Sequence, residues 1–196
     1  MKNFSNRYIF LYVSGLVLLI AVTLTLVSLG LKPRREANVE REKMRQILKA
    51  AGYESNKDEV PNLSALEFQE LAPEHYSIRC ADGSLGEVVR VQGKGLWGPI
   101  WGYVALSSDR TTIKGVAFSH KSETPGLGAK ITDDTFAKQF AGKKLYDADG
   151  LFVSVRVTPK GKEGLLGEEN RVDAISGATI TSRGVDKMLY DGLKEK

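Results

Sequence analysis

The spacing of hydrophobic and polar residues changes twice along the chain and divides it into three stretches. The first, residues 9–31, runs for 23 residues without a charged side chain. A helix rises about 1.5 Å per residue, so this run can cross a hydrocarbon core of about 30 Å. It is longer than the core of a typical signal peptide, although Ser28-Leu29-Gly30 faintly resembles a cleavage site. We therefore predict an uncleaved transmembrane helix after a short N-terminal segment, residues 1–8.

The second stretch, residues 32–75, predicts a helical connector followed by a polar region. Pro33 marks a break after the transmembrane run, and residues 34–51 carry an imperfect apolar stripe that ends before Gly52. The remainder is polar and rich in turn residues, with Ser64 as a candidate cap for a short helix that reaches Leu71. A structural connector between membrane and domain is the role that this pattern favours.

The third stretch, residues 76–196, has short apolar runs separated by turns. The predicted strands cover residues 86–91, 103–106, 112–120 and 151–157, and the predicted helices cover residues 132–140 and a C-terminal segment that begins near Thr179 or Thr181. The second and third strands should form a hairpin around Ser108-Asp109-Arg110. We predict an α+β fold in which one transmembrane helix precedes a curved antiparallel sheet with packed helices.

Composition narrows the function classes. The 196 residues carry a net charge of +4. The basic excess is concentrated just after residue 31, where Lys32, Arg34 and Arg35 can meet lipid headgroups. The sequence has no nucleic-acid motif, so we predict a membrane-lipid contact and no nucleic-acid partner.

The metal-binding residue types are too few for a metal centre. Cys80 is the single cysteine, which excludes an intrachain disulfide, a Cys-based zinc site and an iron–sulfur cluster built by this chain alone. His75 and His120 are the two histidines, and they are far apart in the sequence. We predict that the chain holds no metal ion.

The charges flanking the apolar run bear on orientation. Lys2 and Arg7 precede it, and seven basic residues follow it closely: Lys32, Arg34, Arg35, Arg41, Lys43, Arg45 and Lys49. The positive-inside rule, applied to these counts alone, places the C-terminal domain in the cytoplasm. The rule weakens where a whole domain is exported rather than a short loop.

The segment Ser176-Gly177-Ala178-Thr179-Ile180-Thr181-Ser182 leads into the predicted C-terminal helix. The first turn of a helix has backbone N–H groups without intrahelical partners and favours an anion. Arg183 and Lys187 add positive charge, and the small Gly177 and Ala178 permit close approach to the backbone. Spacing alone favours helix capping as the role of the hydroxyls of Ser176, Thr179 and Thr181.

This segment resembles the flavinylation motif of the FMN-binding domain family, the electron-transfer subunits of bacterial respiratory complexes. The residues that carry the resemblance are Asp173-Ala174-Ile175-Ser176-Gly177-Ala178-Thr179. In that family a flavin transferase joins FMN to the last threonine through a phosphoester. The resemblance implies that Thr179 is the acceptor, that Ser176, Gly177, Ala178 and Thr181 support it, and that Arg183 lies near the phosphate.

A second segment, Glu123-Thr124-Pro125-Gly126-Leu127-Gly128, predicts a tight turn, because Pro125 presets φ and Gly126 suits the next position of a type II turn. Taken alone it is only a turn. It also resembles a loop of the same family that lies against the flavin ring. The resemblance implies that Glu123, Thr124, Leu127 and Gly128 border the cofactor.

The stretch Gly95-Leu96-Trp97-Gly98-Pro99-Ile100-Trp101-Gly102 favours a packing role for its two tryptophans on composition alone. It resembles one branch of the family, the flavoprotein subunits of sodium-translocating NADH:quinone reductases. The resemblance implies a subunit of an oxidoreductase complex that relays electrons through FMN, with other membrane subunits as partners. It also implies a single-pass protein of the bacterial inner membrane with the flavin domain on the periplasmic side, opposite to the charge count.

Two alternatives stay open. One is the equivalent subunit of an Rnf ferredoxin:NAD complex, which differs in electron donor and acceptor. The other is a membrane-anchored assembly module without flavin, in which the segment at Thr179 is a capped helix start and residues 123–128 are a turn.

Overall fold

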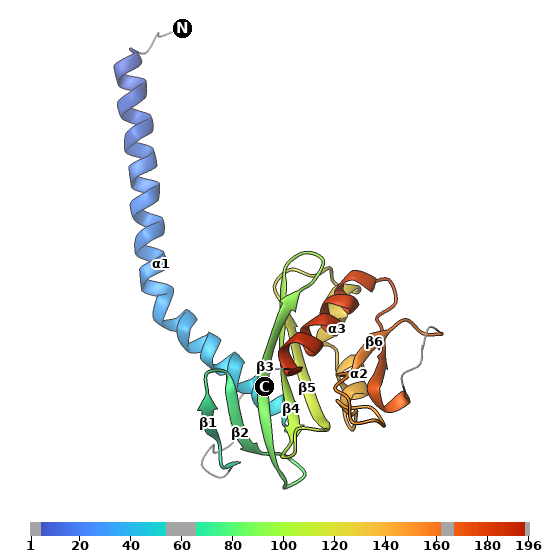
Figure 1. The fold of residues 1–196 in the computed structure, drawn as a ribbon. Helices are drawn as coiled ribbons and strands as arrows, with labels where there is room; N and C mark the ends of the chain where they lie inside the picture. The colour runs from blue at the N-terminus through green and yellow to red at the C-terminus, as the bar shows by residue number, and fades with distance from the viewer. Residues whose placement is uncertain (1–4, 54–65, 162–166, 195–196) are drawn as a thin grey trace. The chain divides into compact units, whose positions relative to one another are not determined.

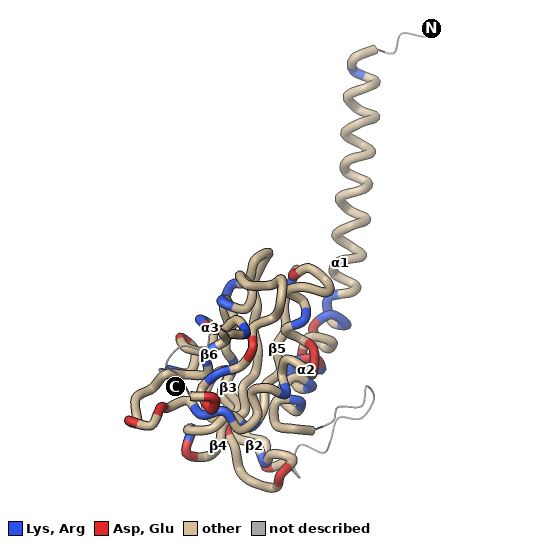
Figure 2. The backbone as a smooth tube through the Cα atoms, turned by 90° about the vertical axis from the view of Figure 1, so that its right-hand side faces the viewer, with Lys and Arg blue, Asp and Glu red and all other residues tan. Residues whose placement is uncertain are grey.

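The computed structural model describes residues 5–53, 66–161 and 167–194 (Figure 1). The chain divides into two units, Met1–Lys43 and Met44–Lys196. In the described residues, one helix, α1 (Asn6–Ala50), is long and apolar enough to cross a membrane. Figure 2 shows the apolar run as an uncharged length of this helix.

The predicted break at Pro33 is wrong, because α1 continues through this residue. A proline inside a helix removes one N–H donor, and the flanking residues, rich in Leu, Arg and Glu, support the helix on both sides. The predicted end before Gly52 is confirmed. Gly52 has a φ of 89°, and the N–H of Tyr53 donates to the carbonyl of Leu48 at 3.0 Å, which closes the last turn.

A five-stranded antiparallel sheet forms the centre of the second unit, with its strands in sequence order. The strands are β1 (Gln69–Ala72), β2 (His75–Arg79), β3 (Leu85–Lys94), β4 (Pro99–Ser107) and β5 (Ile113–His120). Strands β4 and β5 form the predicted hairpin, closed by a hydrogen bond of 2.8 Å from the N–H of Arg110 to the carbonyl of Ser107. The α+β fold with an antiparallel sheet is therefore confirmed.

In the rest of the second unit, the described residues form short elements and one long helix. They are η2 (Gly128–Thr132), α2 (Asp134–Ala137), η3 (Lys138–Phe140), β6 (Arg156–Thr158), η4 (Glu168–Asn170), β7 (Arg171–Asp173) and α3 (Thr179–Lys194). Strands β6 and β7 pair in parallel. Helix α3 begins at Thr179, one of the two predicted starts.

Apolar side chains cover both faces of the five-stranded sheet. Along β4, Ile100 and Val104 face a core that includes Val185 and Leu189 of α3. Tyr103 and Ala105 face the opposite core, which the end of α1 completes. Because side chains alternate along a strand, β4 contributes to both cores, and a helix packs on each of its faces. Helix α3 lies along one of these faces (Figure 1).

Two predicted elements differ from the structure. The alternating stretch over residues 151–157 forms a strand only from Arg156, because Ser154 has a φ of 59° that a strand cannot include. The short helix predicted to reach Leu71 ends earlier, since Leu66 lies in a 3-10 turn and Leu71 already lies in β1. Its candidate cap, Ser64, lies outside the described residues.

Two contacts fix α3 and therefore the segment that leads into it. Gly184 lies so close to β3 that an added Cβ would be 2.4 Å from the carbonyl oxygen of Lys94. Asp186 accepts two hydrogen bonds of 2.8 Å from the Arg156 guanidinium and one of 2.9 Å from the N–H of Val157. The carboxylate raises the pKa of Arg156 through these hydrogen bonds. Strand β6 and α3 are thus joined by a bidentate ion pair.

Replacing Asp186 should destabilise the contact between β6 and α3, and the loss in the free energy of unfolding should grow with the number of hydrogen bonds removed. Asp186→Ala deletes both acceptor oxygens and with them all three hydrogen bonds, and we expect it to lower the free energy of unfolding by about 2–3 kcal/mol. Asp186→Asn keeps an acceptor for Val157 and should cost less than half of that. Chemical denaturation of the full-length protein in detergent measures both, and equal losses would contradict the assignment.

Candidate functional site

A pocket of about 220 Å³ brings together the two segments that the sequence analysis singled out. Its lining residues are Leu96, Glu123, Thr124, Leu127, Gly128, Gly177, Ala178, Thr179, Ile180 and Thr181. Eight of the ten predicted site residues are among them, and Ser176 and Arg183 are not. Residues more than 50 positions apart in sequence therefore share one small cavity.

Glu123 connects the parts of this pocket. Its side chain is 4% exposed. One carboxylate oxygen, Oε1, accepts the backbone N–H of Trp97 at 2.9 Å, and the other, Oε2, accepts the hydroxyl of Thr181 at 2.6 Å. Its own backbone N–H donates to Nδ1 of His120 at 3.2 Å. The carboxylate thus joins the 95–98 turn to the first turn of α3, and the backbone N–H of the same residue bonds to the end of β5.

The 123–128 segment adopts the predicted turn. The N–H of Leu127 donates to the carbonyl of Thr124 at 3.1 Å, and Gly126 has a φ of 77°. Gly128 then passes beside the buried carboxylate, where an added Cβ would be 2.3 Å from Oε2 of Glu123. Only glycine leaves room for this approach.

The segment before α3 turns sharply at Gly177, which has a φ of 78°. The N–H of Ala178 donates to the carbonyl of Ile175 at 3.1 Å, and the carbonyl of Ala178 accepts from the N–H of Ser182 at 2.9 Å. The hydroxyl of Ser182, a buried side chain that the sequence analysis assigned no role, accepts the N–H of Ile175 at 3.1 Å. Ala178 is therefore the residue that precedes the first helical turn.

The hydroxyls of this segment have different environments. Thr181 is 1% exposed and bonded to Glu123. Thr179 is exposed and lines the pocket, and Ser176 is exposed outside the lining set. The segment therefore offers one accessible hydroxyl at the pocket and at the start of α3.

The start of α3 can attract an anion. The carbonyl of Ala178 accepts the first intrahelical hydrogen bond, from the N–H of Ser182. The backbone N–H groups of Thr179, Ile180 and Thr181 lie before this bond, so no carbonyl of the helix accepts them and they can face an anion. Arg183 is exposed nearby, whereas Lys187 donates to Asp191 at 2.6 Å and so is less suited to a ligand.

Apolar side chains form the rim of the pocket. Leu96, Leu127 and Ile180 are exposed and line it, and Trp97 is 66% exposed beside them. The packing role predicted for Trp97 is wrong, because only its backbone N–H reaches the interior. Leu96 and Ile180 were missed at the sequence level, although each directly adjoins a predicted site residue or motif.

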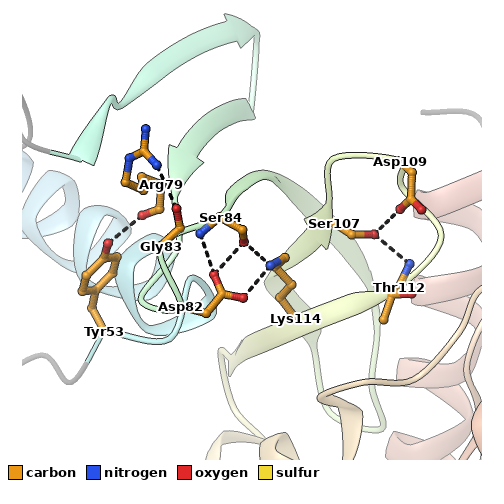
Figure 3. Close-up of polar contacts among 9 residues, drawn as sticks. All are labelled: Tyr53, Arg79, Asp82, Gly83, Ser84, Ser107, Asp109, Thr112 and Lys114. Carbon is orange, nitrogen blue, oxygen red and sulfur yellow. Dashed lines mark hydrogen bonds and ion pairs between the residues drawn. The ribbon is translucent and has the colours of Figure 1, made fainter.

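The turns at the other end of the sheet are polar (Figure 3). Asp82 accepts hydrogen bonds from Lys114 at 2.6 Å and from the backbone of Ser84 at 2.9 Å. Lys114 and Ser84 lower the pKa of Asp82 through these bonds. The nearby Cys80 is a free, buried thiol whose pKa is raised by burial, as suits a structural residue.

Comparison with known proteins assigns the chain to a family. The model of the FMN-binding domain matches residues 95–194, which include both walls of the pocket. The chain belongs to the FMN-binding domain family. A similar chain is the C subunit of the Na(+)-translocating NADH-quinone reductase from Parabacteroides distasonis. Its crystal structure shares 33% identity with a TM-score of 0.71, over 83% of this chain and 93% of that one.

Other similar proteins are also C subunits of Na(+)-translocating NADH-quinone reductases. The one from Vibrio alginolyticus is 29% identical over 94% of this chain and 89% of its own length. The one from Neisseria meningitidis serogroup A is 36% identical over 63% of this chain, and the alignment spans only 47% of that protein. The NqrC structure from Shewanella oneidensis has 26% identity and a TM-score of 0.59, over 82% of this chain and 100% of that one.

The tight approach at Gly128 predicts a local defect in this FMN-binding domain when a methyl group is added. We expect Gly128→Ala to lower the free energy of unfolding by about 1–3 kcal/mol, because the buried carboxylate must shift. Gly167→Ala is the matched control, since a Cβ there meets only ordinary contacts at 3.7 Å or more. Denaturation of both variants in detergent is the measurement, and equal stabilities would contradict the crowding at Gly128.

Proposed function

We propose that this chain is the subunit of a sodium-translocating NADH:quinone reductase that relays electrons through FMN joined covalently to Thr179. The observation that carries the proposal is the exposed hydroxyl of Thr179, at the first residue of α3 and on the pocket shared by both family motifs. The names of the similar proteins support the choice of complex.

The start of α3 fits the phosphate of FMN. Esterification of Thr179 would put the phosphate beside the first backbone N–H groups of α3, which no carbonyl of the helix accepts. This is also the positive end of the helix dipole. The exposed Arg183 adds a cation from the same helical turn. Ser176, Gly177 and Ala178 form the turn that presents the acceptor, and Thr181 holds it in place.

The rim fits the flavin ring. Leu96, Leu127 and Ile180 offer apolar surface. Thr124 offers a hydroxyl, and Gly128 offers backbone polar groups. The pocket is smaller than the roughly 300–1,000 Å³ of ligand sites that enclose a whole molecule. A flavin held here would therefore remain partly open to solvent and to a redox partner, and the tether would prevent its loss.

The bound FMN would supply the redox chemistry, and the chain would supply attachment, orientation and electrostatics. The chain carries neither the Gly-x-Gly-x-x-Gly fingerprint nor a Walker loop, so NADH and quinone would be handled by partner subunits. One apolar helix without an intramembrane charge does not conduct sodium by itself. The proposed contribution is therefore placement of one electron carrier.

We also propose how the chain is anchored in the membrane and on which side the FMN-binding domain lies. Residues 9–31 would anchor the chain in the bacterial inner membrane, and residues 32–75 would connect the anchor to an FMN-binding domain at residues 76–196. We propose the periplasmic side for this domain, following the family rather than the charge count. The basic residues after position 31 would contact lipid headgroups, and a flavin transferase would attach the FMN.

Replacement of Thr179 tests the proposal. Wild-type protein made together with a flavin transferase should give a fluorescent band on a denaturing gel, and Thr179→Ala should abolish it without loss of folded protein. Thr179→Ser keeps a hydroxyl and should retain part of the signal, while Thr112→Val, at the other end of the sheet, should retain all of it. A dark wild-type band would favour the flavin-free assembly module.

A further inference from the structure

We propose that the buried Glu123–Thr181 pair is a positioning element, which fixes the acceptor turn of α3 against the 95–98 turn and the 123–128 loop before flavin is attached. The inference rests on the proposed function and adds a role for two residues that would not react with the cofactor. The pair would therefore hold Thr179, the proposed attachment residue, at a fixed position relative to the 123–128 loop, which would face the flavin ring.

The hydrogen bond itself has the features of a strong contact. Thr181 Oγ1 donates to Glu123 Oε2 at 2.6 Å, and the two residues are 58 positions apart in sequence. Both side chains are almost completely buried, so water competes little for either group. Hydrogen bonds to a carboxylate are shorter and stronger than those between neutral groups, and burial strengthens them further.

The carboxylate is also fixed from its other sides. Oε1 accepts the N–H of Trp97 at 2.9 Å, which holds the 95–98 turn. Added Cβ atoms would lie 2.5 Å from Oε1 at Gly95 and 2.3 Å from Oε2 at Gly128. The two glycines therefore enclose the carboxylate closely, and it has little room to turn away from Thr181.

The helix geometry converts this contact into the orientation of the acceptor. Successive residues of a helix are rotated by about 100°, so Thr179 and Thr181 point to nearly opposite sides. With Thr181 held inward by Glu123, Thr179 is directed to the exposed rim. Thr124 and Leu127 line the same pocket from the loop that carries Glu123.

The fold does not depend on this bond alone. Val185, Met188 and Leu189 bury α3 against the sheet, and Asp186 joins it to Arg156. Removal of the Thr181 hydroxyl should therefore release the first turn of α3 while the remainder stays packed. This separation allows a positioning role to be distinguished from a role in stability.

Thr181→Val tests the inference, because valine has nearly the same shape and lacks the hydroxyl. In the full-length protein incubated with flavin transferase and flavin adenine dinucleotide, the Thr179 hydroxyl would take the FMN phosphoryl group as the pyrophosphate bond breaks and AMP leaves with the hydroxyl proton. We expect this attachment to become at least fivefold slower, measured by intact mass. The attached flavin should also rotate faster in time-resolved fluorescence anisotropy. Thr181→Ser restores the hydroxyl and should recover both values, and Glu123→Gln, which loses the charge, should fall between valine and wild type.

The outcomes separate the two proposals. Attachment rate and anisotropy unchanged in Thr181→Val, with only a lower melting temperature, would overturn the positioning role and leave the proposed function intact. Wild-type protein that acquires no flavin would overturn both. Slower attachment and faster rotation in the valine variant, with recovery in the serine variant, would support both.

Discussion

The arrangement of the site depends on one buried carboxylate. Glu123 accepts a backbone N–H from the 95–98 turn and a hydroxyl from the first turn of α3, and its own N–H bonds to the end of β5. Burial of a carboxylate is costly unless both oxygens are paired, and here the pairing partners come from separate segments. The requirement to satisfy this group therefore brings together parts of the chain that local structure alone would leave independent.

The scaffold holds those segments at fixed positions. Both faces of the antiparallel sheet are covered, by α3 and the short helices on one side and by the end of α1 on the other. Gly184 lets α3 approach β3 closely, and the Arg156–Asp186 pair joins α3 to β6. A site built at the start of a helix that is anchored along its length can present an exposed hydroxyl in one orientation, which a covalent tether requires.

The sequence was most informative where local chemistry determines local structure. Gly126 marks a predicted turn that the structure contains, and the apolar spacing of the last helix predicted a start near Thr179 or Thr181, of which α3 uses the first. It was least informative where tertiary contacts decide. The alternating run before β6 is interrupted at Ser154, whose backbone is left-handed, and α1 passes through Pro33. The exposure of Trp97 was also hidden, because its amide rather than its ring contacts the interior. The bond between Glu123 and Thr181 joins two motifs whose proximity no spacing in the chain reveals.

The central claim is that Thr179 bears the flavin, and mass spectrometry of peptides from protein purified from its native membrane tests it most directly. We expect a mass increase equal to FMN less one water, located on Thr179 of the peptide that starts α3. An unmodified peptide, or the same increase located on Ser176 or Thr181, would contradict it.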